Sequence, residues 1–306
     1  MVLYLRDGAS LRALVIAGAT TLVPLGPYAA AAEALRRLRA DLDAIAGRAL
    51  PQRMLDAALA ATGHDAEALG AAVLDPLLGL IGDRELVVIP TGALVTVPWR
   101  LLAGCAERPV TVAPSAAVWR AALTRRRTAR SGRTALLVSG PGNAHGEAEI
   151  RAIAALTPGA RVLAGVAATP AATLTGLDGA GLAHLAAHGH HEPENALFSS
   201  LDLAGGPLMG YDVQRLNRPP DTVVLSSCDL GLTDVRPGDE ALGMATALLS
   251  AGSATVIASV SRIADHTATA VMTGYHRLAS RSSPAEALAR AAAGEHLSSF
   301  VCFGAG

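Results

Sequence analysis

Two short apolar segments of the chain each end in a residue that can do covalent chemistry. One runs from Gly181 to His188 and is followed by Gly189, and the other runs from Thr222 to Cys228 and is followed by Asp229. A thiol beside an imidazole is a nucleophile beside its base, and an adjacent imidazolium favours the reactive thiolate. The pair therefore predicts nucleophilic catalysis, with His188 as general base and Cys228 as nucleophile.

Backbone groups at the same two positions predict an oxyanion hole. Gly189 has no side chain, so its N–H can approach a substrate oxygen closely, and the N–H of Cys228 can provide a second donor. Such donors stabilise the charge that develops on a carbonyl oxygen during acyl transfer. We expect Gly189 and Cys228 to form this hole.

Both segments have the pattern of buried strands that end in a glycine-containing turn. Reactive groups of an open parallel sheet collect in the crevice at the carboxyl ends of its strands. If the two strands are neighbours, His188 and Cys228 meet there. Strand-like and helix-like segments alternate between Glu85 and Phe303, which predicts a mainly parallel sheet with helices on both faces.

The first quarter of the chain has a different pattern and no evident chemistry. Strands are expected over residues 2–6 and 11–17, with a third over 20–25, followed by a helix from about Tyr28 to Ala46. A second helical stretch, from Pro51 to about Ile81, is expected to break near Gly63. We therefore divide the chain into an extension, residues 1–82, and a catalytic domain, residues 83–306.

Composition excludes several classes of protein. The 306 residues are 51% hydrophobic with a net charge of −1, which predicts a large core and no general attraction to nucleic acid or to an anionic membrane. All 25 basic residues are arginine, which excludes a lysine-dependent phosphate loop, a Schiff-base enzyme and a Ser-x-x-Lys site. No Gly-x-Ser-x-Gly elbow is present either, which disfavours a serine hydrolase of the α/β class.

The expected compartment is the cytoplasm. Three widely spaced cysteines, Cys105, Cys228 and Cys302, imply no disulfide framework, and Cys105 and Cys302 are expected to be small buried hydrophobes. The N-terminal residues do not resemble a signal peptide, and no apolar run reaches the length of a spanning helix.

Two other motifs have ordinary explanations. The arginines between Arg125 and Arg133 contain no interleaved aromatic residues, so we interpret them as a solvated helix end and expect no nucleic-acid partner. The turn Gly140-Pro141-Gly142 precedes a helix expected near Glu147, and we interpret it as a βα turn instead of a phosphate site, for which it lacks the glycine pattern.

A histidine cluster supports an alternative chemistry. His184, His188 and His190 share one face of an extended strand, and His191 follows, so the cluster could hold zinc in a hydrolase. No Cys-x-x-Cys or His-Glu-x-x-His motif supports a metal, and His184 lies in mid-strand, as a core histidine would. Our main interpretation includes no metal and no cofactor.

The ordered set of motifs resembles the CHAT domain family, bacterial relatives of caspases and separases. The motifs that carry the resemblance are Pro90 to Pro98, Pro114-Ser115, Gly140 to Gly142, His184 to Gly189, Asn195 to Leu203, Leu225 to Gly231, Gly238 to Gly243 and Ser250 to Val256. Each motif is short, and the specificity comes from their order. The resemblance implies a caspase-like three-layer α/β/α sandwich, preceded here by a small β-meander and helices.

The resemblance also implies a cysteine endopeptidase acting on protein or peptide substrates through His188 and Cys228, often under the control of a regulatory protein partner. Ser226 and Asp229, beside the cysteine, are the expected substrate-binding residues; some relatives have aspartate where Ser226 stands, to hold a basic side chain. Ser261 stands where the family commonly has tryptophan. A catalytically silent scaffold that keeps the fold is a further alternative.

Overall fold

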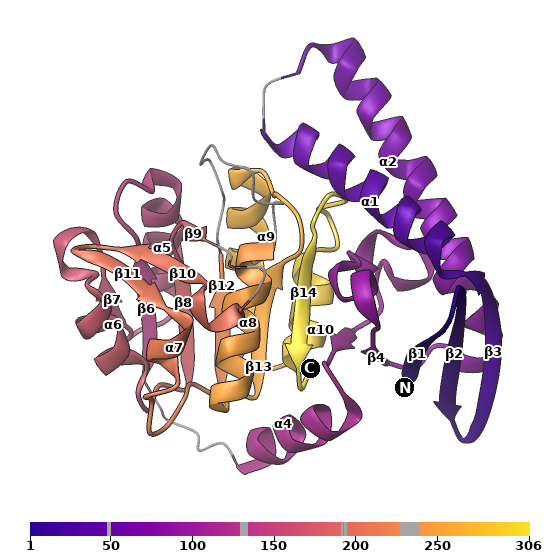
Figure 1. Ribbon diagram of the computed structural model, residues 1–306. Coiled ribbons are helices and arrows are strands. Elements are labelled where there is room, and N and C mark those ends of the chain that lie inside the picture. Colours follow the sequence, from indigo (N-terminus) through magenta and orange to yellow (C-terminus); the bar gives the residue numbers. More distant parts are fainter. Residues whose placement is uncertain (48–49, 129–133, 191, 193–194, 227–238) are drawn as a thin grey trace.

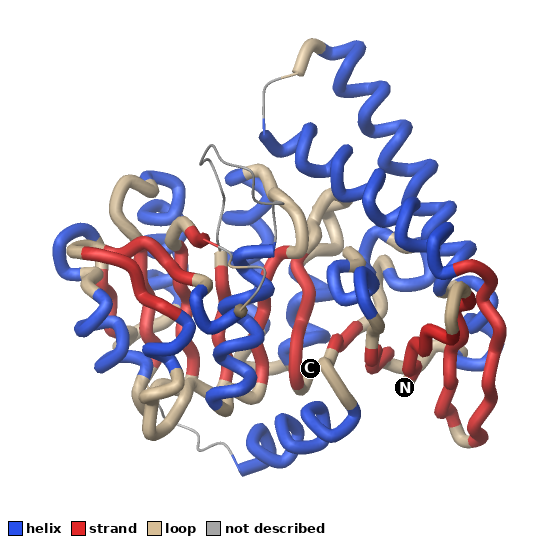
Figure 2. The backbone as a smooth tube through the Cα atoms, viewed as in Figure 1, coloured by secondary structure: helices blue, strands red, loops and turns tan. Residues whose placement is uncertain are grey.

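A computed structural model of the chain describes residues 1–47, 50–128, 134–190, 192, 195–226 and 239–306, the last range without the side chains of 239–241. Within these residues, one eleven-stranded sheet extends through the molecule and helices cover both of its faces (Figures 1 and 2). The strand order is β3-β2-β1-β4-β5-β14-β13-β12-β8-β6-β7. The mixed α/β architecture with a mainly parallel sheet confirms the predicted fold class.

The sheet begins with the expected antiparallel meander. Its strands are β1 (Val2–Asp7), β2 (Ser10–Ala17) and β3 (Ala19–Pro27). The meander is continuous with the rest of the sheet, because β1 pairs in parallel with β4 (Leu86–Ile89). The extension and the remainder of the chain therefore share one sheet.

Two long helices, α1 (Tyr28–Gly47) and α2 (Gln52–Val73), form a hairpin after the meander. The predicted break near Gly63 is wrong, because α2 runs through that residue. An internal glycine costs a helix only about 1 kcal/mol, whereas proline removes a hydrogen bond and clashes with the preceding turn. The helix instead ends shortly before Pro76, and two short helical turns follow, η1 (Asp75–Leu77) and α3 (Leu78–Ile81).

The connection from β4 to the next strand also differs from its prediction. In the sequence, the prolines at positions 90 and 98 predict a turn and a short extended piece. Instead, the connection consists of three 3₁₀ turns that bury Leu94, Trp99 and Cys105, namely η2 (Gly92–Thr96), η3 (Trp99–Leu101) and η4 (Ala103–Cys105).

The remaining strands of the large sheet alternate with helices, as predicted. The strands are β5 (Val110–Val112), β6 (Ala135–Ser139), β7 (Arg161–Leu163), β8 (Leu182–Ala186), β12 (Thr222–Leu225), β13 (Thr255–Ser259) and β14 (Phe300–Gly304). The helices are α4 (Ala116–Thr128), α5 (Ala144–Leu156), α6 (Pro170–Leu177), α8 (Asp239–Ala251), α9 (Asp265–Leu278) and α10 (Pro284–Ala291). Strand β14 runs antiparallel to β13 but parallel to β5.

Polar caps define several helix starts. Ser115 and Thr169 each precede a helical pattern in the sequence, which predicts that they cap those helices. The structure confirms both caps, since their hydroxyls accept from backbone N–H groups at 3.1 and 3.2 Å. Helix α5 begins three residues before the predicted Glu147, because the Asn143 side chain accepts from the Gly146 N–H and caps the helix there.

A second, three-stranded antiparallel sheet was not predicted. Its strands are β9 (Gly189–His190), β10 (Ser200–Leu203) and β11 (Gly206–Met209), in the order β11-β10-β9. Strands of two to four residues are too short to show a clear alternation in the sequence. The short helix α7 (Gly210–Val213) follows.

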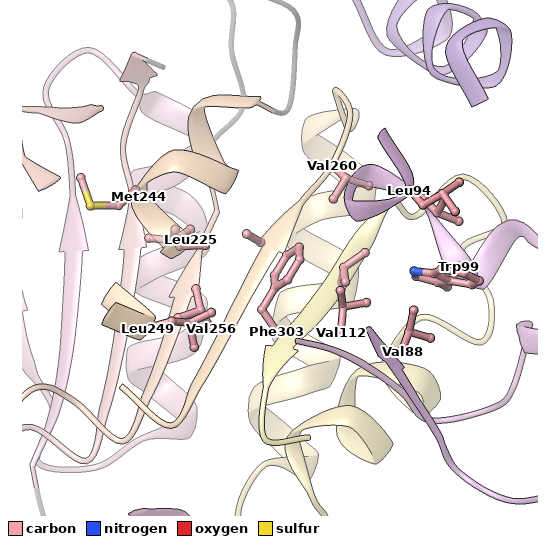
Figure 3. Packing of buried hydrophobic residues seen from close by; sticks show 14 of the residues in the cluster. Val88, Leu94, Trp99, Val112, Leu225, Met244, Leu249, Val256, Val260 and Phe303 are labelled. Carbon is pink, nitrogen blue, oxygen red and sulfur yellow. The ribbon is translucent and has the colours of Figure 1, made fainter. Parts of the chain in front are cut away.

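The core has one layer on each face of the large sheet. Helices α5, α9 and α10 cover one face, while α6, α7, α8 and the small sheet cover the other. Figure 3 shows the second layer continuing toward the extension, from Leu225 and Val256 through Phe303 to Val112 and Trp99. Within the described ranges, every helix is too short or too polar to reach across a lipid bilayer.

Candidate active site

The two strands that carry the predicted reactive residues are neighbours. Strand β8 pairs in parallel with β12, and Leu185 lies opposite Leu225 in the register. Both strands are central, because β6 flanks β8 and β13 flanks β12. The carboxyl ends of β8 and β12 therefore lie at the same edge of the sheet.

His188 lies two residues beyond the end of β8 and is half-buried. Its carbonyl oxygen accepts a hydrogen bond from the Asp202 N–H at 2.8 Å. This bond joins the end of β8 to strand β10 of the small sheet. The backbone that carries the imidazole is thus held from two sides, by the large sheet before it and the small sheet after it.

The second predicted segment is described as far as Ser226. The Ser226 N–H donates to the Leu185 carbonyl at 2.9 Å, which extends the pairing of the two strands by one residue, and the Ser226 side chain is buried. The next residues, 227–238, lie outside the described residues, and with them Cys228 and Asp229. The roles of Ser226, Cys228 and Asp229 stay predictions.

Gly189 occupies a special position in the small sheet. It lies opposite Leu201, next to the bonded pair of His188 and Asp202. Bonded and non-bonded pairs alternate along an antiparallel ladder, so the Gly189 N–H points away from β10. Pairing with β10 therefore leaves this N–H available to a ligand.

Asp202 is a site residue that the sequence did not reveal as one. Its backbone N–H binds His188, and its carboxylate oxygen lies 3.1 Å from Nε2 of His190, an exposed pair. The alternation of Leu201, Asp202 and Leu203 predicts a half-exposed strand, but it does not indicate the strand with which this one pairs. Only the tertiary structure shows that this aspartate faces the histidine motif.

The glycine turn after β6 has a packing function at the same edge. Gly140 donates its N–H to the Ala186 carbonyl at 2.9 Å. A Cβ atom at this position would come within 2.8 Å of the Ala187 Cβ and 2.7 Å of the Asp202 carbonyl oxygen. The residue must therefore be glycine for the small sheet to lie against the end of β8 and β6.

His184 is a core residue, as predicted from its place in mid-strand. It is 0% exposed. Its Nε2 lies 2.7 Å from Glu149 Oε1, and its Nδ1 lies 2.9 Å from His276 Nε2. A carboxylate only accepts hydrogen bonds, so His184 donates from Nε2. We call these three residues the buried Glu–His–His chain.

Neither Glu149 nor His276 could be found from the sequence, because α5 and α9 bring them to β8 from distant positions. Burial, followed by the neighbouring His184, lowers the pKa of His276 to about 2. The His276 imidazole is therefore neutral at physiological pH. This buried chain satisfies both ring nitrogens of His184 inside the core.

The predicted histidine cluster therefore separates into different environments. His184 faces the core and binds Glu149 and His276, whereas His190 is exposed and pairs with Asp202; His191 lies outside the described residues. Among the described residues, no three histidine, cysteine or acidic side chains are grouped so that they could hold a metal ion.

The other two cysteines are buried, and this confirms their prediction. Burial raises the pKa of both the Cys105 and the Cys302 thiol to about 12. Neither thiol forms a significant thiolate at neutral pH.

Ser261 and Arg262 follow β13 at the same edge. The Ser261 side chain is buried, and its carbonyl oxygen accepts from the Ser299 hydroxyl at 3.3 Å. The Arg262 N–H donates to a carboxylate oxygen of Asp43 on α1 at 2.8 Å. This last contact joins the extension to the edge that carries the candidate site.

A family model described as the CHAT domain matches residues 63–295. A sequence search among curated proteins finds no match.

Two solved structures of the Saccharomyces cerevisiae separase–securin complex are similar in fold. One has a TM-score of 0.67 at 9% identity and covers 99% of this chain and 30% of that chain. The other has a TM-score of 0.54 at 12% identity and covers 72% of this chain and 16% of that one. This chain thus spans less than a third of the separase chains that it matches.

Proposed function

Because the family model covers most of its length, the chain belongs to the CHAT domain family, and we propose that it is a cysteine endopeptidase. The observation that carries the proposal is the register of Leu185 opposite Leu225. His188 follows the first of these residues by three positions, and Cys228 follows the second by three. Because the two residues follow a paired position by the same number of residues, on neighbouring parallel strands, the imidazole and the thiol are favoured to lie close together.

The proposed reaction proceeds through a thioester. The His188 imidazole accepts the Cys228 thiol proton, and the thiolate attacks the carbonyl carbon of a peptide bond. The tetrahedral intermediate collapses as His188 gives its proton to the leaving amine, so the C–N bond breaks and a C–S bond remains. His188 then takes a proton from water, which hydrolyses the thioester and restores the thiol.

The developing oxyanion needs donors that are already in place. We propose the N–H groups of Gly189 and Cys228 for this role. The alternation of bonded pairs between β9 and β10 supports the Gly189 donor, because its N–H is directed away from β10. Removing one such donor typically slows acyl transfer about 10²- to 10³-fold.

Ser226 and Asp229 are the proposed substrate contacts beside the nucleophile. A small neutral residue at Ser226 disfavours a pocket that selects strongly for charge, and Asp229 would favour a basic group. We also propose that residues 1–82 act as an extension of a peptidase domain formed by residues 83–306. The separase chains in the similar structures are bound to securin, and we propose that a protein partner regulates this chain too.

The test is the rate at which each cysteine is alkylated as a function of pH, read by peptide mass spectrometry. Cys228 is expected to react at least tenfold faster below pH 7 in the wild type than in His188→Ala, because the imidazolium no longer stabilises its thiolate. Cys105 and Cys302 are internal controls, since burial raises the pKa of both thiols to about 12.

Peptide cleavage is measured on the same preparations. Cys228→Ala and His188→Ala should each abolish it. The proposal fails if either variant cleaves peptides as fast as the wild type, or if the wild-type Cys228 reacts no faster than the two buried cysteines.

A further inference from the structure

A cleft of about 370 Å³ lies beside the edge of the sheet that carries the candidate site. Its outer wall comes from the α1–α2 hairpin, with Leu42, Ile45, Leu55 and Leu59, and its inner wall comes from the loop between β13 and α9, with Ile263. In Figure 1 the hairpin leans from the meander toward the upper end of α9. The volume lies within the range of about 300–1,000 Å³ that is usual for ligand clefts.

The register shows how near this cleft is to the carboxyl end of β12, the strand that precedes the proposed nucleophile in the sequence. Leu225 on β12 lies opposite Ala258 on β13. Three residues farther along each segment are Cys228 and Ser261, and the lining of the cleft begins with the next residue, Arg262. Neighbouring strands are about 4.8 Å apart, and an extended peptide advances about 3.3 Å per residue. A peptide crossing the strand ends from β12 over β13 therefore reaches the cleft about two to four residues from the scissile bond.

The outer wall is a fixed part of the fold. The Asp43 carboxylate accepts the Arg262 N–H at 2.8 Å, so α1 is hydrogen-bonded to the inner wall itself. Leu42, one of the residues of this wall, is also packed in the core and only 1% exposed. The cleft is therefore formed before any ligand arrives, which reduces the entropic cost of binding.

The chemistry of the walls selects the ligand. The outer wall is aliphatic throughout, and its lip at Leu59 is 39% exposed. The inner side combines Ile263, Ala264 and Leu297 with the polar residues Arg262, His266 and Thr267. Covering the outer wall with an apolar group is favourable, while a charged side chain placed against it would lose hydration without gaining a partner from the leucines. Resting on the proposed function, we propose that the cleft holds a large apolar side chain, of the leucine, methionine or phenylalanine class, of the polypeptide substrate.

This assignment gives the extension a role in substrate selection. The family match begins at residue 63, whereas the outer-wall residues Leu42 to Leu59 all precede it. The wall thus belongs to a part of this chain that the family model does not cover. Two proteins could share the catalytic motifs and still differ in this wall.

The experiment uses a defined mixture of synthetic 14-residue peptides in which each position varies, cleaved by the full chain and read by mass spectrometry. The wild type should prefer a large apolar residue at one fixed distance from the cleaved bond. Leu59→Asp should lower kcat/KM about tenfold or more for such peptides and leave peptides with alanine at that position unchanged. The matched control is Leu22→Asp, at a leucine on β3 that is 49% exposed; this variant should cleave like the wild type.

A second arm separates this proposal from the proposed function. Immobilised Cys228→Ala, with and without Leu59→Asp, is incubated with the same mixture, and the retained peptides are sequenced. Enrichment of large apolar residues that Leu59→Asp removes supports the cleft even if the wild type cleaves nothing, in which case only the peptidase proposal fails. The cleft assignment is overturned if neither arm shows a preference for large apolar residues. It is also overturned if Leu59→Asp lowers kcat/KM equally for all peptides.

Discussion

Two histidines four residues apart, one within β8 and one just after it, lie in opposite environments. His184 lies inside the core, where Glu149 and His276 occupy both of its ring nitrogens. His188 lies beyond the strand end, half-buried, at the edge where the parallel strands finish. The residue type is the same, so the difference comes from the position along the strand. A histidine enclosed by fixed partners contributes to the structure, whereas one at the strand ends can meet a substrate.

The buried Glu–His–His chain is costly to break. His184→Ala would leave the Glu149 carboxylate inside the core without its donor, and breaking a buried pair in this way typically costs about 3–5 kcal/mol. We expect a loss of this size in the free energy of unfolding, measured by urea denaturation. His188→Ala should lose much less stability while abolishing the proposed activity.

His190→Ala is the matched control for that experiment, because this exposed histidine makes only a surface pair with Asp202. It should change stability by about 1 kcal/mol or less. A double variant, Glu149→Leu with His184→Leu, should recover part of the lost stability, since apolar residues can replace a buried pair. If His184→Ala were as stable as His190→Ala, the buried chain would have no energetic role.

Because it contains His276, the buried Glu–His–His chain should also make the folded protein less stable in acid. The unfolded chain protonates His276 below about pH 6.5, whereas burial keeps it neutral in the folded protein until about pH 2. The unfolded state therefore binds more protons in this window, and stability falls as the pH falls through 6.5. Between pH 7.5 and pH 5 the expected loss from this one group is about 2 kcal/mol.

Denaturation midpoints measured between pH 7.5 and pH 5 test whether stability falls as the pH falls. His276→Gln removes the titrating group, so its stability should depend less steeply on pH than that of the wild type. A His276→Gln slope equal to that of the wild type would contradict the assignment.

The smallest expected change in stability is that of a variant at the exposed pair of Asp202 and His190. Asp202→Ala removes the carboxylate that pairs with His190, but it keeps the backbone N–H that binds the His188 carbonyl. Exposed ion pairs contribute about 0–1 kcal/mol, so stability should hardly change. Thermal unfolding checks this. A large loss would mean that the edge depends on side-chain contacts as strongly as the core does.

Much of the fold could be predicted from local pattern. The strands of the meander, the helix after Tyr28 and the alternation from β4 to β14 all agree with the periodicity of apolar residues. Errors arose where the local signal was weak. The small sheet has strands too short to show a period, and α2 continues through Gly63 because packing against α1 outweighs the modest cost of an internal glycine.

The residues of the candidate site also fall into two groups, those that the sequence indicates and those that it does not. From sequence alone, His188 could be identified at the end of an apolar run, and His184 as a core residue, because both interpretations depend on position within one segment. Asp202, Glu149 and His276 could not be identified, since each reaches β8 from another element. The cleft between the α1–α2 hairpin and the β13–α9 loop combines residues more than two hundred positions apart.

The sequence by itself thus determined the meander, the alternation of strands and helices in the large sheet, the family and the pair of residues that could do chemistry, because apolar periodicity and short motifs are local properties. Only the tertiary structure decided that β8 and β12 are neighbours, with Leu185 opposite Leu225. It also decided that the extension joins the same sheet through β1 and β4, and that the α1–α2 hairpin is hydrogen-bonded through Asp43 to the edge that carries the candidate site. These are long-range contacts, and they form because separate apolar faces must share one core.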